Sequence, residues 1–167
     1  SGCGKTTVLR SAAGLEKAQG YVRIAGQVWQ DDEKHLFVPT YKRRIGYVFQ
    51  EASLFDHLNV RENLRFGLKR ISDEDGEKRL DDAVELLGIG HLLERRTSEL
   101  SGGERQRCAI ARSLAIKPTA LFMDEPLAAL DHARRLEIVP WIDRLKKELN
   151  LPILYVTHSE EEVMRLA

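Results

Sequence analysis

Two nearly uninterrupted apolar runs constrain the fold of this chain more than any other feature. They are TALFMDEP at 119–126 and PILYVTHS at 152–159, and Leu, Ile, Val, Phe, Tyr and Met dominate both. Runs of this kind are typical of strands in a parallel sheet that is covered on both faces. YVRIAG at 21–26 and RIGYVFQ at 44–50 are shorter and predict two further strands.

Helical patterns fill much of the remaining chain. TTVLRSAAGL, near the start, predicts a first helix. Two sets of apolar residues then recur with helical spacing, and they are Leu80, Ala83, Val84 and Leu87, and Ile138, Ile142, Leu145 and Leu149. Asp131 is a suitable N-cap for the later helix, whereas Pro140 is expected to bend that helix or delay its start.

These patterns together predict an α/β fold with a mostly parallel sheet. The stretch 51–115 contains no convincing strand, so we expect an all-helical insert there. The core would then have a first part at 1–50 and a second part at 116–167. The opening motif lacks a feeding strand and the final helical pattern, EEEVMRLA, lacks a cap. We therefore expect the sequence to be a piece of a longer polypeptide.

Composition excludes several classes of protein. The 167 residues contain 26 Lys and Arg against 26 Asp and Glu, so no net charge attracts nucleic acid, and no nucleic-acid partner is expected. The one basic cluster, 42–44, is expected to be a solvated turn. Cys3 and Cys108 lie far apart, which favours a reducing compartment such as the cytoplasm. No apolar run is long enough to cross a bilayer, so any membrane role requires a partner.

The opening stretch SGCGKTT matches the second half of the phosphate-loop pattern G-x-x-x-x-G-K-[ST]. Gly2 and Gly4 would let backbone N–H groups approach phosphate oxygens. Lys5 would add a positive charge, and the Thr6 hydroxyl would face Mg²⁺. The alternative is a glycine-rich turn with a surface lysine.

The strand LFMDEP ends in two adjacent carboxylates, Asp124 and Glu125. A buried charge is costly unless a cation or hydrogen bonds offset it, so these groups require partners. In a nucleotide hydrolase the first carboxylate holds Mg²⁺ and the second positions the attacking water. The alternative is that one carboxylate caps the next helix and the other is solvated.

LSGGERQR at 100–107 contains both a helix start and a glycine pair. Ser101 and Glu104 have the spacing of a capping box. The helix that follows is expected to bury Cys108, Ala111, and Leu114 or Ala115. The cap does not explain Gly102 and Gly103, because a glycine within a helix lowers its stability by about 0.5–1 kcal/mol relative to alanine. We interpret this helix start as a second anion site.

Six motifs in order along the whole chain make the sequence resemble the nucleotide-binding subunit of ATP-binding cassette (ABC) transporters. They are SGCGKTT, GYVFQ, LSGGERQR, LFMDEP, AALD and YVTHS. The resemblance implies a P-loop NTPase core, interrupted by the helical ABC insert, that hydrolyses ATP with Mg²⁺. It also implies a head-to-tail homodimer, because each chain supplies half of each ATP site.

The resemblance assigns roles by position. The phosphate loop would comprise Ser1, Gly2, Cys3, Gly4, Lys5, Thr6 and Thr7. Gln50 would contact Mg²⁺ and the attacking water, Asp124 would hold Mg²⁺ with Thr6, and Glu125 would be the catalytic base. His158 would contact the γ-phosphate. The signature residues that cover the γ-phosphate in the opposite subunit would be Ser101, Gly102, Gly103 and Glu104, with Asp131 at the dimer seam.

Each of three assignments also has a structural alternative. Gln50 is a polar residue at a strand end, Asp131 is an N-cap, and His158 follows an apolar strand where structural histidines are common. The order and spacing of all the motifs together favour the functional interpretation.

A finer resemblance links the chain to the ATP-binding subunits of bacterial molybdate importers, carried by KRRIGYVFQEASLFDHLNVRENLRFGL, ELLGIGHLLERR and EIVPWIDRLKKELNLPILYVTHS. Asp56, where such proteins usually have proline, and Ala128, where serine is common, depart from the pattern. The partners implied are membrane permease subunits and, indirectly, a periplasmic substrate-binding protein. The location implied is the cytoplasmic face of the inner membrane.

The segment from Glu51 to Gly67, with Phe55, His57 and Phe66, is the candidate docking surface for the permease. The alternative is ordinary packing of the helical insert. Two other functions stay open. One is an importer for sulfate, iron or sugar, and the other is an ABC ATPase without a transport role, in DNA repair, chromosome organisation or translation.

Overall fold

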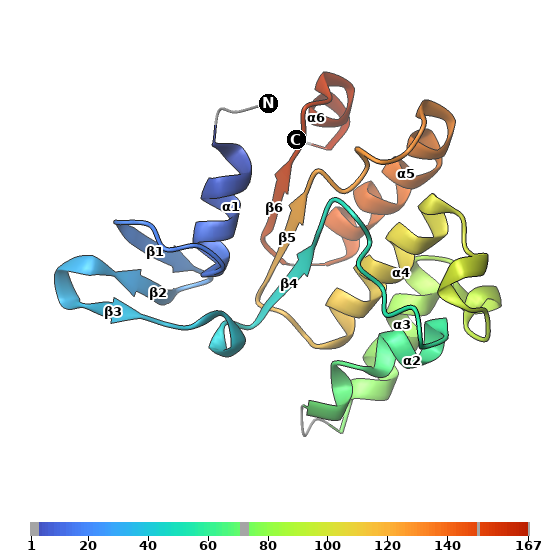
Figure 1. The fold of residues 1–167 in the computed structure, drawn as a ribbon, viewed down its shortest axis with the longest axis horizontal. Helices are drawn as coiled ribbons and strands as arrows, with labels where there is room; N and C mark the ends of the chain where they lie inside the picture. The colour runs from blue at the N-terminus through green and yellow to red at the C-terminus, as the bar shows by residue number, and fades with distance from the viewer. Residues whose placement is uncertain (1–3, 71–73, 150, 167) are drawn as a thin grey trace.

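The computed structural model describes residues 4–70, 74–149 and 151–166 (Figure 1). Its strands form two three-stranded sheets, β1 (Tyr21–Ile24), β2 (Gln27–Asp31) and β3 (Leu36–Phe37), and β4 (Ile45–Val48), β5 (Ala120–Asp124) and β6 (Ile153–Val156). Its α-helices are α1 (Lys5–Ala13), α2 (Val60–Arg65), α3 (Gly76–Leu86), α4 (Gly102–Ala115), α5 (His132–Glu148) and α6 (Glu160–Leu166). Short 3-10 helices cover Asp32–Lys34, Thr40–Lys42, Leu68–Arg70, Gly90–Leu92 and Thr97–Glu99.

The second sheet confirms the predicted parallel core. Strand β5 lies between β4 and β6 and pairs with both in parallel, with Ile45 opposite Ala120 and Leu121 opposite Ile153. All five residues of β5 are buried. Helix α1 covers one face of this sheet, and α4 and α5 lie on the other (Figure 1). The predicted α/β fold is therefore confirmed, and the apolar run at 119–126 is buried because helices cover both faces of its strand.

The first sheet is antiparallel and differs from the prediction. The strand expected at 21–26 ends at Ile24, because Ala25 and Gly26 both adopt positive φ in a two-residue hairpin. The returning strand β2 and the short β3 were not predicted, since QVWQD mixes polar and apolar residues and LF is only two residues long. Trp29 of β2 packs with Leu9 of α1 in the same cluster as Phe122 of β5, so α1 joins the two sheets.

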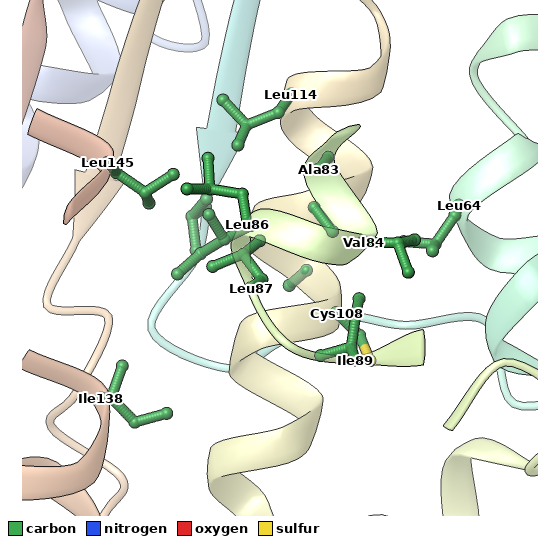
Figure 2. Packing of buried hydrophobic residues seen from close by; sticks show 14 of the residues in the cluster. Leu64, Ala83, Val84, Leu86, Leu87, Ile89, Cys108, Leu114, Ile138 and Leu145 are labelled. Carbon is green, nitrogen blue, oxygen red and sulfur yellow. The ribbon is translucent and has the colours of Figure 1, made fainter. Parts of the chain in front are cut away.

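The described part of 51–115 contains only helices as regular elements, as the sequence predicted. Figure 2 shows apolar side chains from α2, α3, α4 and α5 packed in one cluster. Of the periodic residues, Leu149 is only partly buried, against the edge of this cluster. The others are buried, and they are Leu80, Ala83, Val84, Leu87, Cys108, Ala111, Leu114, Ala115, Ile138, Ile142 and Leu145. The domain limits at 50/51 and 115/116 stay a prediction.

Helix α5 begins where the sequence placed its cap. The Asp131 carboxylate accepts a hydrogen bond of 2.9 Å from the Arg134 N–H. The expected delay of the helix start by Pro140 is wrong, because α5 runs from His132 through that residue. Pro140 lies on the exposed side of the helix, where water can bind the carbonyl that lacks its helical partner.

The expected solvated turn at 42–44 is wrong for its middle residue. Arg43 is 4% exposed, although Lys42 and Arg44 are exposed. Its guanidinium donates 2.7 Å hydrogen bonds to the carbonyls of Val38 and Ala12, and burial lowers its pKa. These backbone carbonyls hold Arg43 against the C-terminal end of α1, and the sequence around Arg43 gives no sign of them.

Arg43→Met is expected to lower the free energy of unfolding by about 3 kcal/mol, because it removes charged hydrogen bonds and leaves buried carbonyls without a donor. Urea unfolding measures this change. Lys42→Met removes the neighbouring exposed charge and is the matched control. Equal stability of the two variants would show that Arg43 does not anchor α1.

Candidate functional site

The carboxyl ends of β5 and β6 meet the N-terminal end of α1. Gly4 precedes α1 with φ of 79°, in the left-handed region that favours glycine, and it lets the chain turn into the helix. Lys5 and Thr6 follow on the first turn of α1, and Thr7 is exposed beside them. Three further phosphate-loop residues from the sequence prediction, Ser1, Gly2 and Cys3, lie outside the described residues.

Both carboxylate oxygens of Asp124 have hydrogen-bond donors. The Thr6 hydroxyl donates to Oδ1 at 2.9 Å, and the Tyr47 hydroxyl donates to Oδ2 at 3.3 Å. Burial first and the neighbouring carboxylate second raise the pKa of Tyr47 well above its ordinary value, so this hydroxyl stays protonated as a donor. These bonds offset the cost of ending the buried strand β5 in a charge.

The sequence analysis missed Tyr47. The residue belongs to GYVFQ, where only the following glutamine was singled out. Its role depends on the pairing of β4 with β5, in which Tyr47 lies opposite Phe122, two residues before Asp124. A tyrosine in a predicted strand is a candidate donor to a buried carboxylate. Only the order of strands in the sheet shows that its partner is Asp124.

Glu125 and His158 form a close pair at the same edge. His158 Nε2 lies 2.5 Å from Glu125 Oε1, and Lys5 Nζ lies 3.2 Å from His158 Nδ1. Because an ammonium group can only donate, Nδ1 accepts and the imidazole proton belongs on Nε2, facing the carboxylate. A lysine, a histidine and a glutamate from three distant segments therefore lie in one row, joined by a hydrogen bond between Lys5 and His158 and by the close contact of His158 with Glu125.

The backbone of Glu125 is strained. Its φ of 46° is unfavourable for a residue with a side chain, and its N–H donates to the Val156 carbonyl at 2.8 Å. This bond holds the residue after β5 against β6. Backbone strain that the surrounding structure maintains is frequent at functional sites, and here it directs the Glu125 carboxylate toward His158.

The oxygens of Thr6 and Asp124 suit a hard cation such as Mg²⁺, which prefers hydroxyl, carboxylate and phosphate oxygens. Among the described residues no group of three or more His, Cys, Asp or Glu side chains can hold a metal by itself. Two neighbouring protein oxygens fit a Mg²⁺ ion that takes its other ligands from phosphates and water.

The start of α4 has the predicted capping box. The Ser101 side chain accepts from the Glu104 N–H at 3.3 Å, and the Ser101 N–H donates to the Glu104 carboxylate at 2.8 Å. The second bond is the main cause that holds the pKa of Glu104 below its ordinary value. The local interpretation of this motif as a helix start is therefore confirmed.

Gly102 and Gly103 also have a packing role that the sequence did not reveal. A Cβ atom at Gly102 would lie 2.8 Å from Leu130 Cδ2, and one at Gly103 would lie 3.3 Å from Ile138 Cδ1. The absence of side chains lets the start of α4 approach the segment before α5 and α5 itself. Their use as an anion site stays a prediction.

Gln50 and Asp131 do not join the row around His158 by any described contact. Gln50 is exposed after β4 and borders a cavity of about 350 Å³ with Gly102, Arg105, Gln106, Pro126 and Leu130. Asp131 caps α5 and forms an ion pair with Arg134 at 3.4 Å. The signature residues at the start of α4 lie across the β4–β5–β6 sheet from α1 (Figure 1).

Comparison with known proteins identifies the family. The model of the family described as ABC transporter matches residues 1–128. The chain belongs to the ABC transporter family. Its likeness to solved structures agrees, with a TM-score of 0.79 and 31% identity to cbiO1 of Clostridium perfringens, part of the ABC transporter complex cbiONQ. That match covers 95% of this chain and 65% of cbiO1.

A second solved structure is the ATP-binding cassette MJ0796, determined as a dimer in a post-hydrolysis state with ADP and Pi. It matches with a TM-score of 0.74 and 28% identity over 97% of this chain and 73% of that one. This ABC chain therefore shares its fold with a cassette that holds nucleotide products.

The similarity to molybdate importers is also confirmed. The proteins named molybdenum import ATP-binding protein ModC from Pseudomonas syringae pv. tomato and Thiobacillus denitrificans are each 60% identical over 168 residues, and the one from Methylococcus capsulatus is 61% identical over 170. Each match covers all of this ABC chain and 46% of the relative. The chain spans about half the length of these curated relatives.

The lowered pKa of Glu104 predicts a pH-dependent contribution of α4 to stability. The contribution is complete above the ordinary pKa of 4.5 and is lost as pH falls through the lower value of the folded state. At neutral pH, Glu104→Gln is expected to lower the free energy of unfolding by about 0.5 kcal/mol, since the amide keeps part of the cap but not the charge.

Urea unfolding from neutral to acidic pH tests this dependence. The difference between wild type and Glu104→Gln should shrink below pH 4.5. Glu85→Gln, at an exposed position of α3, is the control and should show no such trend. A difference that persists unchanged at acidic pH would contradict a charged capping box.

Proposed function

We propose that the protein containing this ABC chain hydrolyses Mg-ATP to power import of molybdate or a related oxyanion. The observation that carries the proposal is the convergence of Lys5, Thr6, Asp124, Glu125 and His158 at one edge of the parallel sheet. The oxyanion is suggested by the relatives that are named molybdenum import ATP-binding proteins.

Binding of ATP would use the start of α1. The backbone N–H groups of the phosphate loop and the N-terminal end of this helix would hold the β- and γ-phosphates, and the Lys5 ammonium would add positive charge. Thr6 and Asp124, with Gln50, would hold Mg²⁺, which offsets phosphate charge when bound. The bond between Thr6 and Asp124 supports this assignment because it brings two suitable oxygens together.

Hydrolysis would use the Glu125 carboxylate as base. Its oxygen would accept a proton from the water that attacks the γ-phosphate, and Gln50 would help to orient that water. His158, held between Lys5 and Glu125, is within reach of both groups and would donate from Nε2 toward the γ-phosphate once ATP is bound. This row of side chains, at the carboxyl ends of β5 and β6, is thus suited to proton transfer and charge stabilisation.

Completion of the site would require a second copy of the chain. Ser101–Glu104 lie across the sheet from α1, so they are better suited to cover ATP bound to a partner than ATP on the same subunit. Asp131 would lie at the seam of this head-to-tail dimer. The dimeric state of the similar cassette MJ0796 supports the arrangement.

Coupling to transport would use the segment 51–67. Phe55 packs against Phe66 with ring centroids 4.3 Å apart, and the buried Asn63 side chain donates to the carbonyls of Phe55, Leu58 and Asn59. This segment, which includes α2, would receive the permease subunits, while a periplasmic substrate-binding protein would deliver the oxyanion. None of the helices in the described ranges combines the length and apolarity needed to cross a bilayer. We propose a peripheral location on the cytoplasmic face of the inner membrane.

Glu125→Gln in the full-length protein is expected to retain ATP binding and to lower turnover about a hundredfold or more, because the amide cannot accept the proton from water. Phosphate release and equilibrium ATP binding measure the two effects. Glu137→Gln, at an exposed position of α5, is the control. Turnover equal to that of the control would remove Glu125 as the base.

Ser101→Arg is expected to lower turnover by roughly tenfold or more relative to Ser101→Ala, because both lose the helix cap but only arginine adds bulk at the γ-phosphate cover. Steady-state ATP hydrolysis by full-length dimers measures the difference. If the two variants hydrolyse ATP at the same rate, the start of α4 does not face nucleotide.

A further inference from the structure

Glu162 is a buried carboxylate for which the proposed ATP chemistry has no use. It lies in α6, close after His158, and its side chain is 4% exposed. Its neighbours in sequence, Glu160 and Glu161, are exposed. A carboxylate is buried only where donors or a cation offset its desolvation, so the surroundings of Glu162 indicate what it does.

Glu162 binds both sides of the turn that carries His158, with its carboxylate on the side before His158 and its backbone N–H on the side after it. Its Oε2 accepts from the Thr157 hydroxyl at 2.7 Å and from the Tyr155 hydroxyl at 2.8 Å. The Glu162 N–H donates to Ser159 Oγ at 3.3 Å, and the Ser159 N–H donates to Thr157 Oγ1 at 3.0 Å. The residues directly before and after His158 are therefore tied to one another and to α6.

Tyr155 strengthens the link to the sheet. Burial first and the bond to Glu162 second raise the pKa of this phenol well above its ordinary value, so the hydroxyl stays a donor. Because Tyr155 belongs to β6, the same carboxylate fixes the end of the strand and the turn that follows. The backbone of His158 is thus held from the strand, the turn and the helix.

Arg135 connects this network to the segment before α5. Its Nε lies 3.5 Å from Glu162 Oε1, an ion pair rather than a hydrogen bond, and its Nη2 donates to the Leu130 carbonyl at 3.4 Å. Leu130 in turn packs against the position of Gly102 at the start of α4. A continuous set of contacts therefore runs from the start of α4 to the turn that holds His158.

We propose that Glu162 is a positioning residue that sets the place of His158 beside Glu125 and, through Arg135, links that turn to the 126–131 segment. The inference rests on the proposed function only for the catalytic use of His158. The placement of the imidazole is a property of the protein without nucleotide. The side-chain partners described for Glu162 are Tyr155, Thr157 and Arg135, and none of them is assigned to phosphate.

The test compares Glu162→Gln with Glu161→Gln, which changes the adjacent exposed carboxylate, in the full-length protein. Glu162→Gln is expected to shift the NMR signals of the His158 ring nitrogens without ATP present. It should also lower kcat roughly tenfold or more, because small displacements of catalytic groups are costly, while KM for ATP changes less than about twofold. Glu161→Gln should leave the ring signals, kcat and KM at their wild-type values.

Thr157→Val is the second variant, for use if Glu162→Gln does not fold. It keeps the shape of the side chain at 157 and the ion pair between Glu162 and Arg135, but it removes one hydrogen-bond donor to Glu162. It should shift the His158 signals in the same sense. Wild-type ring signals in either folded variant would overturn the proposal, as would a raised KM with unchanged kcat. A wild-type protein without ATP turnover would overturn the proposed function instead, while the ring signals would still decide the role of Glu162.

Discussion

The carboxylate of Asp124 is the constraint on which the rest of the structure depends. Strand β5 is buried along its whole length, including this residue, so the carboxylate is largely removed from water and requires donors. Thr6 of α1 and Tyr47 of β4 supply them. The first helix, the neighbouring strand and the central strand therefore meet at one group, and the same oxygens that satisfy the fold are suited to a cation beside phosphate.

Local and distant roles coincide in the signature motif. Ser101 and Glu104 start α4 by a reciprocal cap, which any soluble helix can use. Gly102 and Gly103 let that helix approach Leu130 and Ile138, which the cap alone does not require. The proposed contact with nucleotide bound to a second subunit would be a third role of this motif. It depends on the packing of α4 against Leu130 and Ile138, because that packing sets the direction in which the start of α4 faces.

The errors of the sequence analysis share a physical cause. Arg43 belongs to a basic run and was expected in solvent, yet the carbonyls that bury it come from α1 and from the segment after β3. Strand β2 was missed because its pairing with β1, rather than a strong alternating pattern, stabilises it. Tyr47 and Glu162 were overlooked because their partners lie on other strands and helices.

The sequence by itself determined the parallel strands, the helix caps, the family motifs and the identity of the candidate residues, because these depend on short-range spacing and on residue type. Only the tertiary structure decided which groups meet. Thr6 and Asp124 are 118 residues apart, and Lys5 and His158 are 153 apart, yet each pair is in contact. Such contacts depend on the order of β4, β5 and β6 and on the packing of α1 against this sheet. Strand order and helix packing arise from the whole core rather than from any local sequence pattern.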